Sequence, residues 1–353
     1  MSASVMEVQP IVSRREFDNY GRSLPERWQN LTYHFLAGGM RWHQAKSILM
    51  NQPSIRIPDP KSSALNAVLC LDETYLCIAD SPTLVMIHDM AWLDNDAHPA
   101  GIFRERKRLR SRLLLARLRK SAAAVLTVSE FSRDRILHHE PALKSKLFVV
   151  PNFLRSSFDS SEPVAYASRN TALHANRYVH LPGGLSYRKN APLVAEAWRK
   201  FSRYHPQTTL VITGIIDRTY RGLLNDCQNV EIRGFVSESE LMEIYLGASV
   251  VWLPSRYEGF GMPALEAMAL GRPVVASDIP AFREVCGDAV AFASPLEPDA
   301  HVQQLRKIIE CSDTCSAVQE DARSRAGKFN SRRATDTMMD IIFNVVSRWQ
   351  KRG

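Results

Sequence analysis

Two glutamates lie close together in the stretch SRYEGFGMPALEAMALGRP, residues 255–273, and their setting suggests ligand binding. Glu258 falls in a glycine-rich turn, and Glu266 falls in a segment of helical composition. Pro263 suits the first turn of that helix, because backbone N–H groups there have no hydrogen-bond partner within the helix and proline lacks only such a group. A helix that starts near Gly261 offers free N–H groups and the positive end of a dipole, so this turn is expected to favour an anion.

The two carboxylates are expected to border one cleft. Glu258 follows an apolar segment, residues 250–255, and open α/β sheets bind ligands beyond the carboxyl ends of their strands. Helical side chains lean toward the helix N-terminus, so Glu266 reaches back to the same place. Backbone N–H groups suit phosphate, and carboxylates accept hydrogen bonds from sugar diols. A nucleotide-sugar carries both chemical features, and the stretch therefore predicts a site for one.

The elements that position these residues alternate regularly in the second half of the chain. Short, β-branched apolar segments, typical of a parallel sheet covered on both faces, alternate with helical segments. Strands are predicted at 178–183, 209–215, 230–235, 250–255, 273–278 and 289–294, and helices at 191–205, 220–227, 237–248, 262–270 and 280–287. This pattern predicts an α/β domain of the Rossmann type.

The first half is predicted to form a second Rossmann-like domain. Strands are expected at 84–89, 123–130 and 146–152, with helices at 104–121 and 131–139. We expect an N-terminal domain at 1–160, a C-terminal domain at 170–330, and a terminal amphipathic helix within 331–353 that packs at the domain junction.

The positive charge of the chain is concentrated in one segment. The formal net charge is +8, and residues 104–120 hold nine basic residues and one acidic residue, so the remainder is balanced. The plainest interpretation is a solvated helix face. The leucines of the segment would then point to the core: Leu109, Leu113, Leu114, Leu115 and Leu118.

A sharper hypothesis makes the same segment a patch for an anionic membrane surface or an acceptor, because anionic headgroups attract clustered basic residues. Such a patch suits a lipid-linked acceptor and would use Arg104, Arg106, Lys107, Arg108, Arg110 and Arg112. Nucleic acid is disfavoured as a partner, because the run contains no aromatic residues for base stacking.

The remaining composition favours a globular protein without a metal. The six cysteines form no CxxC pair and have no zinc-site spacing with the histidines, so we expect reduced thiols. No apolar stretch approaches the length of a transmembrane helix, and the N-terminus lacks a secretory pattern. We therefore expect a cytoplasmic protein, attached at most peripherally to the inner face of the cell membrane, that uses no cofactor.

Residues 253–295 closely resemble the E-x7-E region of family 4 glycosyltransferases, with its strand, turn and helix followed by PVVAS and REVCGDA. Further segments agree in order: VMIHDMAWL at 85–93, VLTVSEFSRD at 125–134, VVPN at 149–152 and LPGGLSYRKN at 181–190. The resemblance extends from about residue 84 to about residue 345. It implies the GT-B fold, in which two Rossmann-like domains face a central cleft and the last helix crosses back to the N-terminal domain. The acceptor would bind to the N-terminal domain and the nucleotide diphosphate-sugar donor to the C-terminal domain.

The resemblance also implies roles for single residues. Glu258 would contact hydroxyls of the donor sugar, and Glu266 would bind the nucleotide ribose. Arg188 and Lys189 would neutralise the diphosphate, and His88 would lie near the reacting carbon. The backbone N–H groups that line the family's sugar and phosphate pocket correspond to Phe260, Gly261 and Met262.

Two glycines belong to the same implied site. Family members often have arginine near Gly184, where this chain has two glycines, and Gly21, in NYGRS, corresponds to the family's N-terminal glycine loop. The plain alternatives for the other residues are solvated acids for the two glutamates, a core-edge histidine for His88, and surface charges for Arg188 and Lys189.

The implied activity is retaining transfer of a sugar, with GDP-mannose as the first donor considered, to a hydroxyl of a saccharide or lipid-linked saccharide. No residue in the sequence is recognisable as a covalent nucleophile, which fits front-face substitution assisted by the leaving phosphate. The alternatives are an epimerase of the same shape and a non-catalytic scaffold that binds nucleotide-sugars. The segment Asp94–Asp96 imitates the metal-binding Asp-x-Asp of the other large glycosyltransferase fold, but the glutamate pair favours a site without a metal.

Overall fold

The computed structural model describes residues 67–71, 81–94, 97–155, 157–158, 177–310 and 315–351, together with the backbone of two short strands, β1 (Ile11–Ser13) and β2 (His34–Leu36). The expected boundary between the domains at 1–160 and 170–330 falls outside these residues. β1 and β2 pair in parallel. None of the described helices is both long enough and apolar enough to cross a membrane.

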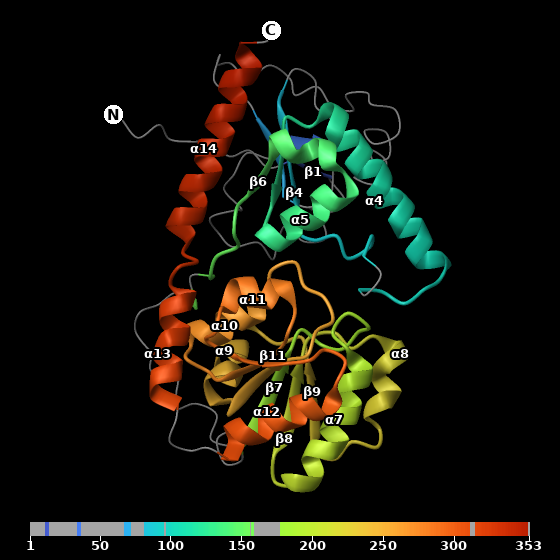
Figure 1. Cartoon of the computed structure of the whole chain (residues 1–353), viewed down its shortest axis with the longest axis vertical. Helices are drawn as coiled ribbons and strands as arrows, with labels where there is room; N and C mark the ends of the chain where they lie inside the picture. Colours follow the sequence, from blue (N-terminus) through green and yellow to red (C-terminus); the bar gives the residue numbers. More distant parts are fainter. Residues whose placement is uncertain are drawn as a thin grey trace.

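The N-terminal half forms a parallel sheet of four described strands in their order along the chain (Figure 1). These are β3 (Val68–Cys70), β4 (Thr83–Ile87), β5 (Ala124–Thr127) and β6 (Leu147–Val149). Helices α4 (Ile102–Ser121) and α5 (Glu130–His139) and the 3₁₀ helix η2 (Pro141–Lys146) connect the last three strands. All five residues of β4 and all four of β5 are buried, as the run of apolar residues in each predicts for central strands.

The C-terminal half forms a parallel sheet of six strands in the order β12-β11-β10-β7-β8-β9. The strands are β7 (Tyr178–Pro182), β8 (Thr209–Thr213), β9 (Val230–Gly234), β10 (Val250–Leu253), β11 (Val274–Ser277) and β12 (Ala291–Ala293). The chain builds outward from β7 in one direction and then returns to pair β10 with its other edge. The order of the strands therefore reverses between β7 and β10, and such a point is where doubly wound sheets bind ligands.

Helices cover both faces of this sheet. Side chains of α9 (Glu238–Gly247), α10 (Met262–Ala269) and α11 (Pro280–Cys286) pack with one face, and those of α7 (Ala191–Tyr204) and α12 (Pro298–Glu310) pack with the other. The predicted helix at 220–227 is wrong in extent, because α8 (Arg218–Arg221) gives way at Gly222 to a 3₁₀ turn, η3 (Gly222–Leu224). No element was predicted between 294 and 330, where α12 and α13 (Cys315–Ala326) lie.

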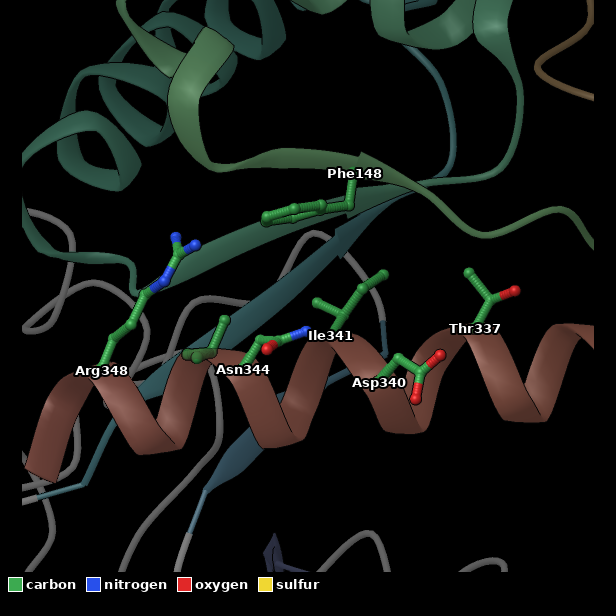
Figure 2. Close-up of a pocket in the computed structure, with 7 residues that line it drawn as sticks. Phe148, Thr337, Asp340, Ile341, Asn344 and Arg348 are labelled. Atoms are coloured by element: carbon green, nitrogen blue, oxygen red, sulfur yellow. The ribbon is translucent and has the colours of Figure 1, made fainter.

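The last helix, α14 (Ser331–Gln350), lies against the N-terminal sheet, as predicted (Figure 1). Its buried residues Ile341, Ile342, Val345 and Val346 belong to one hydrophobic cluster that also contains side chains from both sheets. Figure 2 shows Phe148 of β6 and Ile341 of α14 pointing into a shared groove of about 290 Å³. The helix therefore connects the C-terminal half to the N-terminal sheet through apolar packing.

The two halves also meet at a close backbone contact beside Gly259. A Cβ atom placed on this glycine would lie 2.2 Å from the carbonyl oxygen of His88. The Gly259 carbonyl accepts hydrogen bonds from the hydroxyls of Ser129, at 2.6 Å, and Ser132, at 3.0 Å. The carboxylate of Glu284 on α11 accepts the first backbone N–H groups of α5. Only glycine fits at residue 259 without displacing the opposite half.

The substitution Gly259→Ala is therefore expected to lower the free energy of unfolding by about 1–3 kcal/mol, because the added methyl group must displace the backbone of His88. The control is Gly222→Ala, since Gly222 has helical backbone angles and nothing lies within 4 Å of its added Cβ. Urea unfolding of the two variants measures the difference. Equal stabilities would contradict the close contact.

Candidate functional site

The candidate site lies at the reversal point of the C-terminal sheet, where two turns meet. One turn follows β7 and carries Arg188 and Lys189, and the other follows β10 and carries Glu258. The backbone N–H of Arg256 donates to the carbonyl of Arg188 at 2.9 Å, which fixes one turn against the other. Parallel strands that are neighbours in the sheet thus bring residues 70 positions apart into contact.

The side chain of Glu258 is only 7% exposed, and it is surrounded by donors. Lys189 Nζ donates to Oε1 at 2.7 Å, and Arg188 Nη1 donates to Oε2 at 2.7 Å. The hydroxyl of Ser255 donates to Oε1 at 2.8 Å. One carboxylate therefore faces two cations, and the cluster of these ionised side chains carries one excess positive charge.

The electrostatics of this cluster keep Glu258 ionised. Burial by itself would raise the pKa of the Glu258 carboxyl, but Lys189 and Arg188, with the hydrogen bonds from Lys189 and Ser255, lower this pKa to about 2. Glu258 in turn raises the pKa of the Arg188 guanidinium above its ordinary value, against the effect of burial. Glu258 and Arg188 are thus both charged at neutral pH.

Glycines shape the first turn of the site. Gly184 has a φ of +72°, and a Cβ placed there would lie 1.8 Å from the carbonyl oxygen of Ile215. An arginine, which the family often has near this position, does not fit this backbone. Gly184 therefore packs the turn after β7 against the turn after β8.

Helix α10 starts with the geometry that the sequence predicts. Gly261 is its N-cap in the left-handed region, with a φ of +109°, and no side chain caps the helix. Pro263 lies in the first turn. The side chain of Phe260 is buried and packs edge-on against Phe329, so only its backbone is available to a ligand. The start of α10, at Met262, lies four residues after Glu258.

Glu266 is buried in a second network of its own. The hydroxyl of Tyr245 donates to its Oε2 at 3.0 Å, and Arg155 Nη2 donates to its Oε1 at 2.5 Å. Burial, followed by the charge of Glu266, raises the pKa of the Tyr245 hydroxyl well above its ordinary value, so this hydroxyl stays a donor. Arg155 comes from the segment after β6, on the way from one sheet to the other. Glu258 and Glu266 therefore have separate cationic partners.

Several of these partners were missed by sequence reasoning. Ser255 stands three residues before Glu258 in the same turn, and that spacing could have drawn attention to it. Arg155 and Tyr245 lie 111 and 21 positions from Glu266, and no local pattern connects them to it.

His88 follows β4 and reaches the site through its backbone. Its carbonyl lies against Gly259, next to Glu258, whereas its Nε2 donates to the carbonyl of Leu71 at 2.9 Å. Nearby, His98 stacks on Trp92 with ring centroids 3.8 Å apart. Burial and then the charge of Arg188 lower the pKa of the His98 imidazole. The segment after β4 therefore lies within electrostatic reach of the turn that carries Arg188.

Other predicted residues lie elsewhere. Asp94 forms an ion pair with Arg135 and a hydrogen bond with His139, at 3.0 Å, and so belongs to a local network of the N-terminal half. Within the described ranges, no group of three or more histidine, cysteine or acidic side chains could hold a metal ion. Gly21 and Asp96 lie outside the described residues.

Comparison with known proteins agrees with this geometry. Residues 169–325, which contain both glutamates and both cations, match the family described as Glycosyl transferases group 1. These residues belong to that family. The prediction of a family 4 glycosyltransferase region is thereby confirmed.

Curated glycosyltransferases are similar over part of the chain. An O-antigen chain mannosyltransferase B of Escherichia coli is 35% identical over 196 residues, which cover 51% of this chain and 50% of that protein. An O-antigen chain mannosyltransferase of Salmonella typhimurium is 33% identical over 109 residues, covering 31% of this chain and 29% of that protein. The chain thus spans about half the length of the first of these glycosyltransferases.

Solved structures confirm the GT-B fold. The Anabaena protein HepE, crystallised with UDP and glucose, has a TM-score of 0.63 at 18% identity and covers 75% of this chain and 72% of its own. The sucrose-phosphate synthase of Thermosynechococcus elongatus has a TM-score of 0.61 at 20% identity, covering 76% of this chain and 69% of its own. At these identities the likeness establishes the fold.

The pKa of Glu258 predicts how stability depends on pH. Because this pKa is lowered from 4.5 to about 2 on folding, the stabilisation is full above pH 4.5 and is lost as pH falls through 2. The shift corresponds to roughly 3 kcal/mol of unfolding free energy. Glu258→Gln should lose this part of the acid dependence, whereas the exposed-site control Glu297→Gln should keep it.

Urea unfolding of the wild type and both variants between pH 7 and pH 3 measures this effect. The curve for Glu258→Gln should lie below the wild-type curve at pH 7 and approach it as the pH falls. Parallel curves would show that Glu258 is not stabilised by its two cations.

Proposed function

We propose that the chain is a retaining glycosyltransferase. In this proposal it moves a hexose from a nucleotide diphosphate-sugar to a hydroxyl of a saccharide or lipid-linked saccharide. The observation that carries the proposal is the excess positive charge of Arg188 and Lys189 over Glu258, at the carboxyl ends of β7 and β10. The uncapped start of α10, four residues further along, adds the positive end of a helix dipole. Both features attract a diphosphate.

In the proposed mechanism, the diphosphate replaces Glu258 as the partner of Arg188 and Lys189. The two cations then stabilise the negative charge that grows on the leaving diphosphate. The carboxylate of Glu258 turns to hydroxyls of the donor sugar and accepts their hydrogen bonds. Glu266 accepts hydroxyls of the ribose beside Tyr245.

The transfer step follows from these positions. The bond between the anomeric carbon and the diphosphate oxygen breaks, and the acceptor oxygen forms a bond to the same face of that carbon. The acceptor's proton passes to the leaving diphosphate oxygen. His88, whose backbone contacts Gly259, brings the N-terminal half to the reacting carbon.

Mannose is proposed as the transferred sugar because several similar proteins are named mannosyltransferases. GDP-mannose is therefore the first donor to test, with UDP-sugars as comparison. The proposed acceptor binds to the N-terminal half, on the side of the site that His88 and Trp92 border.

Thermal unfolding with a panel of nucleotide-sugars tests the proposal, because a ligand that binds the native state raises the melting temperature. The preferred donor should raise it in the wild type. Lys189→Met should weaken donor binding about 10- to 100-fold, since a hydrogen bond between charged groups is lost. The exposed-lysine control Lys307→Met should bind like the wild type.

Incubation of the bound donor with radiolabelled sugar then separates the alternatives. Release of nucleoside diphosphate with transfer to a saccharide supports the glycosyltransferase. An isomerised donor with no transfer indicates an epimerase, and binding without turnover indicates a scaffold. If no nucleotide-sugar or nucleoside diphosphate binds, the site assignment is wrong.

A further inference from the structure

The first half of α4 stands clear of the hydrophobic core. The first buried residue of this helix is Ser111, and the other buried positions, Leu114, Leu115 and Leu118, lie within two turns of it on one face. The preceding turns, residues 102–110, contain no buried residue. Figure 1 shows that the N-terminal end of α4 extends away from the N-terminal sheet. Packing on the hydrophobic core therefore holds only the C-terminal half of the helix.

The free portion presents apolar side chains to solvent. Ile102 is 77% exposed, Leu109 is 59% exposed and Leu113 is 41% exposed. Their spacing of seven and four residues places all three on one face of a helix with 3.6 residues per turn. That face is opposite to the face of Ser111 and Leu118. The expectation that Leu109 and Leu113 point to the core is therefore wrong, because the two sets of leucines occupy opposite sides.

Arginines border this apolar line on both sides. Arg106 and Arg110 follow one side along the helix, and Arg112 lies on the other. All three are exposed, and none of them forms an ion pair with another described residue. By contrast, Arg108 pairs with Glu105 at 3.2 Å.

Both ends of the helix are held in place. At its C-terminal end, Lys146 Nζ donates to the carbonyls of Arg119 and Ala122, at 2.8 Å each. At its start, the Lys107 ammonium lies over the rings of Trp92 and Phe103, at 5.4 and 5.5 Å from their centroids. Trp92 belongs to the turn after β4, which also carries His88. The apolar and basic face is therefore fixed next to the candidate site.

We propose that residues 102–113 of α4 form a docking surface for an anionic lipid bilayer. Ile102, Leu109 and Leu113 would enter the boundary between headgroups and acyl chains, while Arg106, Arg110 and Arg112 contact the headgroup phosphates. This division of an interfacial helix into an apolar line and basic flanks is what a bilayer surface accommodates. A nucleic acid would use the arginines and leave the leucines in water.

This docking surface rests on the proposed function and would place the transfer reaction at the membrane. A saccharide carried on a lipid would be presented at the membrane plane, beside the turn that carries His88. The docking itself involves none of the donor-site residues, so it is tested by vesicle binding without any sugar transfer. Failure of the transfer reaction and failure of the docking are thus separate results.

Flotation of the full chain with vesicles is the test. Vesicles of phosphatidylcholine mixed with phosphatidylglycerol should carry the protein, and vesicles of phosphatidylcholine alone should leave it behind. Replacing Arg106, Arg110 and Arg112 by glutamine should weaken binding roughly 100-fold, because each arginine contributes severalfold near an anionic surface. The control replaces three exposed arginines elsewhere, Arg203, Arg332 and Arg333, and should change binding far less.

Variants of the exposed leucines provide a second test of the docking surface. Leu109→Ser with Leu113→Ser leaves the net charge unchanged and should weaken binding at least about 10-fold through lost apolar burial. Leu296→Ser, at an exposed leucine of the C-terminal half, is the matched control and should bind normally. Circular dichroism and the melting temperature of each variant establish that it is folded.

Two outcomes would overturn the proposal. If anionic vesicles fail to carry the wild type, the surface does not dock on a bilayer. If the arginine variant loses binding but the leucine variant keeps it in full, the helix binds anions only, as it would bind an RNA, and does not enter the membrane boundary.

Discussion

The ion pairs of Glu258 with Arg188 and Lys189 hold the candidate site together. Charged groups are costly to desolvate, and their mutual contacts, together with the hydroxyl of Ser255 and the carbonyl of Tyr257, offset this cost. The pairs join the turn after β7 to the turn after β10 across the reversal point of the sheet. In the proposed mechanism, a diphosphate enters by replacing the carboxylate as the partner of these two cations.

The residue after Glu258 extends this constraint to the other half of the chain. Gly259 presents its carbonyl to Ser129 and Ser132 and leaves no room beside the backbone of His88. Glu258 is therefore the direct chain neighbour of Gly259, where the two halves touch. The ion pair of Arg155 with Glu266 is a second link, because Arg155 lies on the segment that leaves the N-terminal sheet. The surroundings of Glu258 and of Glu266 are thus each joined to the N-terminal half.

Local sequence signals predicted the framework of the site. The strand, turn and helix over residues 250–270 were read correctly because hydrophobic runs, glycines and Pro263 encode them within a few positions. The parallel sheet and the packing of α14 followed from the same periodicities. Arg155 and Tyr245 carried no such signal, because their contacts with Glu266 arise only when the chain has folded.

The leucine-rich segment of α4 shows another limit of sequence reasoning. Five leucines among nine basic residues suggest one apolar face. In the structure, the C-terminal half of the helix packs on the core and the N-terminal half is exposed, and the buried and exposed leucines lie on opposite sides. Which leucines are buried depends on where the sheet ends beneath the helix, and the amino-acid composition of the segment does not indicate that position. The missed helices α12 and α13 lie in an interval where no element was predicted.

The central claim is that Glu258 occupies the two cations until a diphosphate replaces it. Titration calorimetry of GDP and UDP with the wild type, Glu258→Gln and Lys189→Met tests it most directly. If the carboxylate competes with the diphosphate, Glu258→Gln should bind the nucleoside diphosphate at least as tightly as the wild type, while Lys189→Met binds it more weakly. If Glu258→Gln loses as much affinity as Lys189→Met, the carboxylate supports the diphosphate site and does not compete for it, and the account is contradicted.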